Sequence, residues 1–368
     1  MLIHKLFLEN FRNYSAQPFS FDPLCNVIYG ENAQGKTNLL EAIVCLSTGK
    51  SHRTRSDKEL IRFQQAGFKI EGNISSRNRD FLTSIQVESG RKKQITINKV
   101  TIKNASELSR TLNTVFFCPE DLQLIREGPA SRRRFMDVSL CQLRPNYAMA
   151  LAEYTKLHEH KTRILRDHDQ RPDLLETLPE FNIRMAEAGA ILIHYRARFA
   201  KLLSAYAATT HQECSGGRED LEIRYSTVKT VENAFADRTT LTMQLMEHQK
   251  THYQAELSSR QCLSGPHKDD LEVILNDLPA RSFASQGQTR TAALAMKLAD
   301  REIHREIIGE YPVLLLDDVL SELDPRRQEF VLNRISGGQV FITCCEDDRL
   351  SRLLNGKVFH IQNGIVLS

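Results

Sequence analysis

The sequence has no tryptophan and no long hydrophobic run among its 368 residues. No apolar stretch approaches the roughly 18 residues that a membrane-spanning helix needs, and the N-terminus shows no signal-peptide charge and cleavage pattern. Apolar residues make up 41% and charged residues 26%, as in ordinary globular proteins. We therefore expect a cytoplasmic protein without a membrane partner.

Recognisable zinc spacings and a strong charge bias are also missing. The eight cysteines form no C-x-x-C pair and no Cys/His pair at zinc spacing, which predicts reduced, mostly buried thiols. The net charge is only +3, which neither requires nor excludes nucleic acid. Any DNA-binding surface must therefore be local.

The most informative motif is G-E-N-A-Q-G-K-T, which follows the apolar run Val27-Ile28-Tyr29. It matches the phosphate-binding loop G-x-x-x-x-G-K-T, whose glycines let backbone N–H groups turn toward phosphates. Lys36 is expected to reach the β- and γ-phosphates of ATP, and the Thr37 hydroxyl to complete a Mg²⁺ site. The predicted nucleotide-binding residues are Gly30, Glu31, Asn32, Ala33, Gln34, Gly35, Lys36 and Thr37.

A second motif lies near the other end of the chain, where the apolar run 313–316 leads into Asp317 and Asp318. A buried parallel strand places functional residues at its carboxyl end. Asp317 is the expected Mg²⁺ carboxylate, and Asp318 is the candidate that orients and deprotonates the attacking water. The alternative role for Asp318 is a helix N-cap.

Between these motifs, the segment S-Q-G-Q at 285–288 precedes a helical pattern and resembles the signature motif of ATP-binding-cassette ATPases. The resemblance implies that Ser285, Gly287 and Gln288 bind the γ-phosphate of a nucleotide held by a second subunit, so that ATP brings two copies together. The segment 321–324 resembles the S-x-L-D loop of that family, which places Asp324 at the dimer interface. Thr343 and Cys344 stand where many such ATPases have a switch histidine, which suggests slow hydrolysis.

The opening segment 2–14 ends in N-F-R-N-Y and resembles the start of SMC-like ATPases, which makes Arg12 a candidate nucleotide ligand. The alternative for Arg12 is a surface charge. Together with the motifs above and the segments 49–55, 119–121, 131–135 and 265–270, the match runs from end to end. On these motifs the sequence resembles the RecF family of recombinational repair proteins.

This resemblance implies an α/β fold, with an ABC-type, SMC-like head as the P-loop ATPase lobe. It also implies a slow ATPase that acts as a switch, with ATP and Mg²⁺ as cofactors and an ATP-dependent homodimer. The implied partners are double-stranded and gapped DNA near single-strand gaps, and RecO and RecR in the loading of RecA. The role of the segment 265–270 is left unassigned.

The pattern along the chain agrees with that architecture. Alternating runs at 68–74, 81–87 and 95–102 predict an antiparallel β meander, and helical periodicity at 129–166 and 177–213 predicts a helical hairpin. No heptad seam is sustained, so a long coiled coil is not expected. The predicted parts are an ATPase lobe from 1–125 and 263–368, and a helical lobe at 126–262.

Two other functions remain open, a transporter's nucleotide-binding subunit and a nuclease built on an SMC-like head. The 249 positions between Lys36 and Ser285 (285 − 36) exceed the usual transporter spacing. A nuclease needs an added acidic metal site. The pair Asp167 and Asp169 has D-x-D spacing but lies in a polar linker, which favours a solvated turn.

Two basic clusters are candidate DNA contacts. Three consecutive arginines on a helix fan over about 200°, so we expect at least one of them to form an intramolecular ion pair. The second cluster follows the phosphate-loop helix, and its alternative is a solvated loop. The candidates are Arg132, Arg133 and Arg134 in the first cluster, and Lys50, Arg53 and Arg55 in the second.

Overall fold

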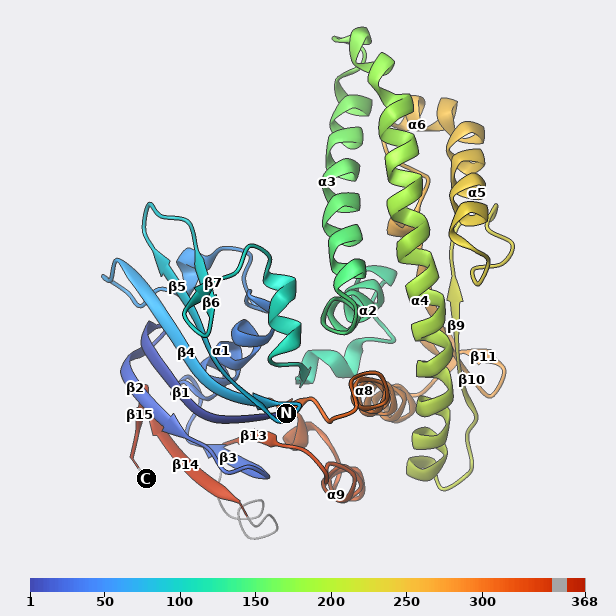
Figure 1. The fold of residues 1–368 in the computed structure, drawn as a ribbon. Coiled ribbons are helices and arrows are strands. Elements are labelled where there is room, and N and C mark those ends of the chain that lie inside the picture. The colour runs from blue at the N-terminus through green and yellow to red at the C-terminus, as the bar shows by residue number, and fades with distance from the viewer. Residues whose placement is uncertain (346–355, 368) are drawn as a thin grey trace. The chain divides into compact units, whose positions relative to one another are not determined.

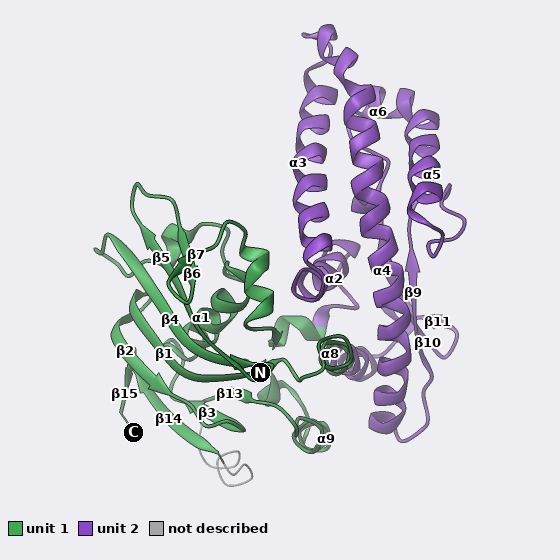
Figure 2. Ribbon diagram, in the orientation of Figure 1, with its two compact units in different colours: residues 1–122, 297–368 green, residues 123–296 purple. Residues whose placement is uncertain are grey.

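The structure is a computed structural model that describes residues 1–345 and 356–367. The chain divides into two compact units, residues 1–122 with 297–368 and residues 123–296 (Figure 2). The first boundary lies close to the predicted residue 125. The second lies at residue 296 rather than 262, because strand β10 (Asp270–Leu275) pairs with β9 (Leu221–Ser226) and so joins the second unit.

One six-stranded sheet of the first unit is antiparallel, in the order β2-β1-β4-β5-β6-β7 (Figure 1). The predicted meander corresponds to β4, β5 and β6, and the third predicted run is split by the turn at Asn98-Lys99, where both residues have positive φ. The strands are β1 (Leu2–Phe11), β2 (Tyr14–Ser20), β4 (Gly67–Ser76), β5 (Arg79–Glu88), β6 (Gln94–Ile97) and β7 (Val100–Thr101).

The other sheet of this unit is parallel except for its last strand, in the order β15-β14-β3-β13-β12-β8. The whole of β12 is buried, as its continuous apolar run predicts. Because β3, β13 and β12 are parallel neighbours, their carboxyl ends meet at one edge of the sheet. The strands are β3 (Cys25–Tyr29), β8 (Thr114–Phe117), β12 (Val313–Leu316), β13 (Val340–Cys344), β14 (Lys357–Gln362) and β15 (Ile365–Val366).

Helix α1 (Lys36–Thr48) lies between the two sheets and contacts β4 and β5 of one and β8 and β13 of the other. Burial on both sides explains why its apolar residues form a nearly continuous run rather than a single stripe. The same unit contains α9 (Pro325–Arg334) and the last part of α8 (Gln286–Ile308).

The second unit is built mainly of helices, with a small sheet in the order β11-β10-β9. The predicted hairpin is present as α3 packed against α4. The first predicted helix is broken at Arg144, which is extended before Pro145, as the residue before a proline prefers. The elements are α2 (Pro129–Leu143), α3 (Pro145–Asp167), α4 (Leu178–Ser215), α5 (Arg238–Thr251), α6 (Tyr253–Ser259), β11 (Leu278–Pro279) and α7 (Ala280–Phe283).

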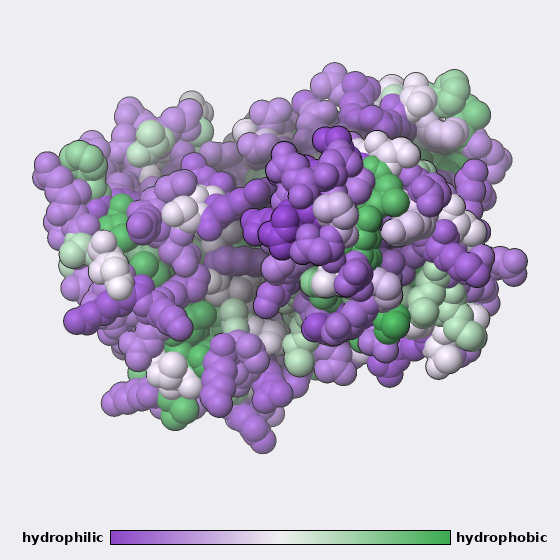
Figure 3. All heavy atoms as spheres, turned by 90° about the horizontal axis from the view of Figure 1, so that it is seen from above, coloured by the Kyte–Doolittle hydropathy of each residue, from purple (hydrophilic) through white to green (hydrophobic). Residues whose placement is uncertain are grey.

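Within the described residues, each helix is too short or too polar to cross a bilayer. The face drawn in Figure 3 is mostly hydrophilic, and its hydrophobic residues gather in small separate groups. The longest helix, α4, packs its buried residues against α3, α5 and β9.

Candidate nucleotide-binding site

The phosphate loop joins β3 to α1 through backbone that only glycine adopts easily. Gly30 has a φ of 149° and Gly35 a φ of 120°. A Cβ on Gly30 would lie 2.3 Å from the carbonyl oxygen of Ile361, and one on Gly35 would lie 2.7 Å from Nδ2 of Asn13. The strand, glycine loop and helix therefore adopt the arrangement that presents backbone N–H groups to a phosphate.

Lys36 is the first residue of α1, and its side chain turns back into the loop. Its Nζ donates to the carbonyl oxygens of Gly30, at 2.6 Å, and Glu31, at 3.2 Å, and only 4% of the residue is exposed. The Cys345 sulfur lies 3.7 Å from this ammonium and 3.2 Å from Oδ1 of Asn32. An ammonium held inside the loop in this way is suitably placed to donate hydrogen bonds to phosphate oxygens.

The N-F-R-N-Y turn supports the loop from one side. Asn13 donates from Nδ2 to the Gln34 carbonyl at 2.8 Å, and the buried Tyr14 hydroxyl donates to the Gly35 carbonyl at 2.9 Å. Sequence reasoning assigned a site role to Arg12 alone in this turn. The signal for Asn13 and Tyr14 was present, because both residues belong to the same motif.

The C-terminal hairpin also supports the loop at Gln34. The Asn363 N–H donates to Oε1 of Gln34 at 2.7 Å, and the Gly364 N–H donates to the Gln34 carbonyl at 3.0 Å. Asn363 and Gly364 both have positive φ, as a two-residue hairpin turn requires. From the sequence this pair predicted a turn, and nothing in it indicated a contact with residue 34.

The two predicted Mg²⁺ ligands lie together although 280 positions separate them. Thr37 donates from Oγ1 to Oδ1 of Asp317 at 3.0 Å. Thr343, at the end of β13, donates to the same oxygen at 2.9 Å and accepts the Asp318 N–H at 2.8 Å. The residue that replaces the expected switch histidine therefore ties the two carboxylate residues together.

The environments of the two carboxylates differ. Burial raises the pKa of Asp317 above its ordinary value, although hydrogen bonds from Thr343 and Thr37 work in the opposite direction. Asp318 has a φ of 49°, a conformation that costs a non-glycine residue about 1–3 kcal/mol. Its Oδ1 is buried and has no hydrogen-bond partner among the described residues, and its side chain does not cap the short helix that follows. A strained, unsatisfied carboxylate beside Asp317 fits a site for a cation and a water.

Arg12 pairs with a carboxylate that sequence reasoning missed. Its guanidinium donates to both oxygens of Glu41, at 2.9 and 2.8 Å, and to the Glu59 carbonyl at 2.9 Å. Glu41 lies on α1, is fully buried, and also accepts from Ser51 and lies 3.6 Å from Arg53. In the sequence, Glu41 stands within an otherwise apolar run, which could have indicated a buried ion pair. The pair with Glu41 contradicts the alternative that Arg12 is only a surface charge.

The candidate residues that follow α1 remain accessible. Lys50, Arg53 and Arg55 are all exposed, so their proposed DNA contacts stay compatible with the structure. Arg53 also donates to Oδ1 of Asn38 at 3.1 Å.

The signature segment begins helix α8 in the second unit. Gln288 N–H donates to the Ser285 hydroxyl at 3.2 Å, and the Ser285 N–H donates to Oε1 of Gln288 at 2.8 Å, which forms a capping box. Ser285 is exposed and Gly287 is half-buried. In the first unit, Asp324 caps α9 by accepting the Arg327 N–H at 3.1 Å. Contacts of these residues with a second subunit remain a prediction.

The prediction that Arg132 contacts DNA is wrong. Only 4% of Arg132 is exposed, and its guanidinium donates to both carboxylate oxygens of Asp270, at 2.7 and 2.9 Å. The remaining nitrogen donates to three backbone carbonyls, those of Leu124, Ile125 and Glu127. The expected intramolecular ion pair within the arginine cluster is thus confirmed, and it removes this residue from any DNA surface.

The neighbouring arginines and the 265–270 segment belong to the same region. Arg133 is half-buried and donates to the Asp269 carbonyl at 2.7 Å, whereas Arg134 is exposed on α2. Asp269 is fully buried and lies 2.8 Å from Arg196 of α4. The segment whose role the sequence left open therefore joins α2, α4 and β10 within the second unit.

The whole chain matches one protein family. The model described as RecF/RecN/SMC N terminal domain covers residues 2–365. The DNA replication and repair protein RecF of Agathobacter rectalis is 40% identical over 368 residues, which are 100% of this chain and 99% of that protein. The same protein of Acetivibrio thermocellus is 38% identical over 348 residues, 95% and 94% of the two chains. The chain belongs to the RecF family.

Solved structures agree with this assignment. A structure of the recombination mediator protein RecF with ATP, in the RecFOR pathway, is 34% identical, covers 99% of this chain and 96% of that chain, and gives a TM-score of 0.89. The Smc head domain of Pyrococcus furiosus is 16% identical with a TM-score of 0.54, which indicates a shared fold only. The predicted ABC-type, SMC-like head fold of the RecF family is therefore confirmed.

Proposed function

We propose that this chain is an ATP-gated DNA clamp of recombinational repair, in which ATP closes a homodimer and slow hydrolysis opens it. The observation that carries the proposal is the 3.0 Å hydrogen bond from Thr37 to Asp317, which assembles the phosphate loop and the D-D motif at one sheet edge. The RecF relative solved with ATP supports ATP as the nucleotide.

The residues at this edge divide the work of holding and cleaving the nucleotide. The loop N–H groups and Lys36 would bind the β- and γ-phosphates, and Thr37 and Asp317 would hold Mg²⁺, which neutralises charge on the phosphates. Asp318 orients the attacking water and accepts its proton. Its unsatisfied buried oxygen leaves an acceptor available for that water.

The position of the signature segment at the start of a helix supports dimerisation. Ser285, Gly287 and Gln288 would bind the γ-phosphate held by the other copy, and Asp324 would lie at the same interface. The exposure of Ser285 supports this role. Thr343, which takes the place of a switch histidine, supports slow turnover and hence a switch that remains closed while ATP is bound.

The closed dimer would bind double-stranded DNA near single-strand gaps in the cytoplasm and act with RecO and RecR to load RecA. Support comes from relatives named DNA replication and repair protein RecF. The candidate DNA contacts are now Lys50, Arg53, Arg55, Arg133 and Arg134. Arg12 would act beside the nucleotide through its fixed position on Glu41.

The transporter and nuclease alternatives receive less support. The RecF match extends over the whole chain, including the helical unit that a transporter subunit does not need. Asp169, of the D-x-D pair, forms an ion pair with Arg260 and lies 3.2 Å from Nε2 of His168. Among the described residues, the acidic pair belongs to no group that is positioned to hold a metal ion.

Sedimentation with and without ATP and duplex DNA tests the proposal. We expect the wild-type chain to dimerise with ATP, and Asp318→Asn to accumulate as the ATP-bound dimer. Ser285→Arg should bind ATP but remain monomeric, whereas Ser258→Arg, an exposed change on α6, should dimerise normally. A Ser285→Arg chain that dimerises like the wild type would refute the shared site.

A further inference from the structure

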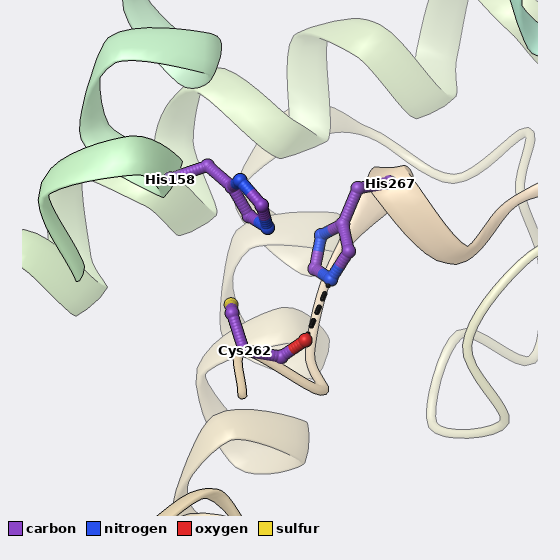
Figure 4. A group of neighbouring side chains, drawn as sticks. All are labelled: His158, Cys262 and His267. Atoms are coloured by element: carbon purple, nitrogen blue, oxygen red, sulfur yellow. Dashed lines mark hydrogen bonds between the residues drawn. The ribbon is translucent and has the colours of Figure 1, made fainter. Parts of the chain in front are cut away.

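We propose that the second unit carries a zinc-binding site formed by His158, Cys262 and His267. His158 lies on α3, Cys262 lies in the loop after α6, and His267 lies in the short 3₁₀ helix Pro266–Lys268. One ligand atom from each residue lies within 4.8 Å of the others, and within the described ranges this is the single such group of three. Figure 4 shows the two imidazole rings next to each other, with Cys262 beside them.

The donor set suits a borderline-soft metal. Zinc accepts imidazole nitrogen at about 2.0–2.1 Å and thiolate sulfur at about 2.3 Å, usually with tetrahedral geometry. The three ligand atoms lie within 4.8 Å of one another, so a metal ion placed between them would need them to move closer together. Three protein ligands leave the fourth position for water.

The tautomer of His267 is fixed by its surroundings. Its Nε2 lies 2.9 Å from the Cys262 carbonyl, and because a carbonyl only accepts, this nitrogen carries the proton. Nδ1 therefore carries no proton, and its lone pair accepts a hydrogen bond from the Tyr154 hydroxyl at 2.8 Å. Metal-bound histidines commonly donate their other N–H to a carbonyl in this way. The Tyr154 hydroxyl is then the group that a metal must displace.

The two imidazole rings lie in contact with each other. The rings lie 4.4 Å apart between centroids, a contact that two imidazolium cations would not make. A neutral imidazole binds zinc through the lone pair of its unprotonated nitrogen and releases no proton.

The loop that carries Cys262 is fixed by a buried ion pair. Glu256 and Lys161 lie 2.7 Å apart with each side chain 1% exposed, and Glu256 also accepts the Leu263 N–H at 2.8 Å. Zinc binding would release the thiol proton to solvent and form the metal–sulfur bond.

Sequence spacing did not reveal this group. Cys262 lies 104 positions after His158 (262 − 158), so only the packing of α3 against the 262–268 segment brings the two side chains together. The sequence prediction of no zinc-spaced Cys/His pair also gave no weight to Cys262 and His267, which lie five positions apart (267 − 262).

Cobalt titration of the reduced, chelator-treated full-length protein tests the site. We expect one Co²⁺ per chain, with a sulfur-to-cobalt charge-transfer band and tetrahedral d–d bands that Zn²⁺ abolishes. Cys262→Ser and His158→Gln should each weaken binding at least about tenfold. His160→Gln, an exposed change on the same helix, should leave binding unchanged. Tyr154→Phe should strengthen binding, because the competing hydroxyl is removed.

Two results would overturn the proposal. One is the absence of the charge-transfer band in the wild-type protein, and the other is its persistence in folded Cys262→Ser and His158→Gln variants. Should the variants fail to fold, X-ray absorption of the wild-type zinc complex decides. A first shell of one sulfur and two imidazole nitrogens supports the site, and any shell without sulfur refutes it.

Discussion

Lys36 of the phosphate loop and Arg132 of the arginine cluster are equally buried, at 4% exposure each, yet their charges are compensated differently. Among the described residues, Lys36 contacts two backbone carbonyls and a thiol, none of which carries a full negative charge. Arg132 forms a two-point ion pair with Asp270 and three further hydrogen bonds to carbonyls.

The difference separates a cation available to a ligand from one used in folding. Burying an ammonium without a carboxylate is unfavourable, and an incoming phosphate would relieve that cost. The Arg132 guanidinium already has an ion pair and hydrogen bonds inside the protein. Binding a phosphate would require it to give up the ion pair with Asp270, so phosphate binding would not be favoured. Basic residues in a motif therefore need their intramolecular partners identified before they are assigned to a ligand.

The largest effect is expected when Lys36, the buried cation without a carboxylate partner among the described residues, is replaced. Lys36→Met should abolish detectable ATP binding, because the β- and γ-phosphates lose their only expected side-chain cation in the loop. The fold should remain intact, since no carboxylate loses its partner. Nucleotide fluorescence titration and circular dichroism measure the two quantities. Lys92→Met, an exposed change in the loop between β5 and β6, is the control. Normal ATP affinity of the Lys36 variant would contradict the comparison.

The second effect tests the saturated cation. Arg132→Met should lower the free energy of unfolding by about 3–5 kcal/mol, because Asp270 and three carbonyls lose a buried partner. Arg134→Met, an exposed change in the same cluster, should alter it by less than about 0.5 kcal/mol. Urea unfolding followed by circular dichroism gives both values. Equal stability of the two variants would show that the difference in burial does not distinguish these neighbours.

Sequence reasoning recovered the parts of the site that depend on local spacing. The glycine loop, Lys36 and Thr37 are contiguous, and the run before Asp317 predicted a buried strand that the structure contains. The contact between Thr37 and Asp317 was expected because the carboxyl ends of parallel strands meet at one edge.

The remaining features depend on long-range pairing that no local pattern encodes. Arg132 and Asp270 are 138 positions apart, and Gln34 and Asn363 are 329 apart. The role of Thr343 depends on β13 lying between β3 and β12. The second domain boundary was misplaced for the same reason, because the pairing of β10 with β9 assigns the 263–296 segment to the helical unit.

A smaller effect concerns Glu41, which compensates Arg12 as Asp270 compensates Arg132. Burial by itself raises the pKa of Glu41, but hydrogen bonds from Arg12 and Ser51 outweigh it and leave the pKa below its ordinary value. A depressed carboxylate pKa stabilises the fold above the unfolded-state pKa, about 4.3, and this contribution is lost as the pH falls through the folded-state pKa.

Glu41→Gln should therefore lower the free energy of unfolding at pH 7 by about 2 kcal/mol, the value of hydrogen bonds to a charged group. The difference from the wild type should shrink as the pH falls below the unfolded-state pKa of about 4.3 and then through the lower folded-state pKa, where Glu41 itself becomes protonated. Urea unfolding at several pH values measures it, and Glu71→Gln, a half-buried change on β4, serves as the control. A difference that stays constant with pH would mean that the charge of Glu41 does not matter.

The smallest expected effect concerns the arginines and lysines that the chain leaves accessible. Log K for duplex DNA falls with log salt by about 0.9 for each phosphate that a protein neutralises. Replacing Lys50 and Arg55 together by glutamine should lower this slope by up to about 1.8 in the ATP-bound state, and Arg134→Gln by up to about 0.9. ATP binding should not change, because none of the three lies in the phosphate loop. Fluorescence anisotropy across a salt series, with and without ATP, gives the slopes. Lys92→Gln removes the same charge elsewhere and should leave the slope unaltered. An equal decrease in that control would place the DNA surface on the β meander. The exposure of Lys50, Arg55 and Arg134 would then not identify them as DNA contacts.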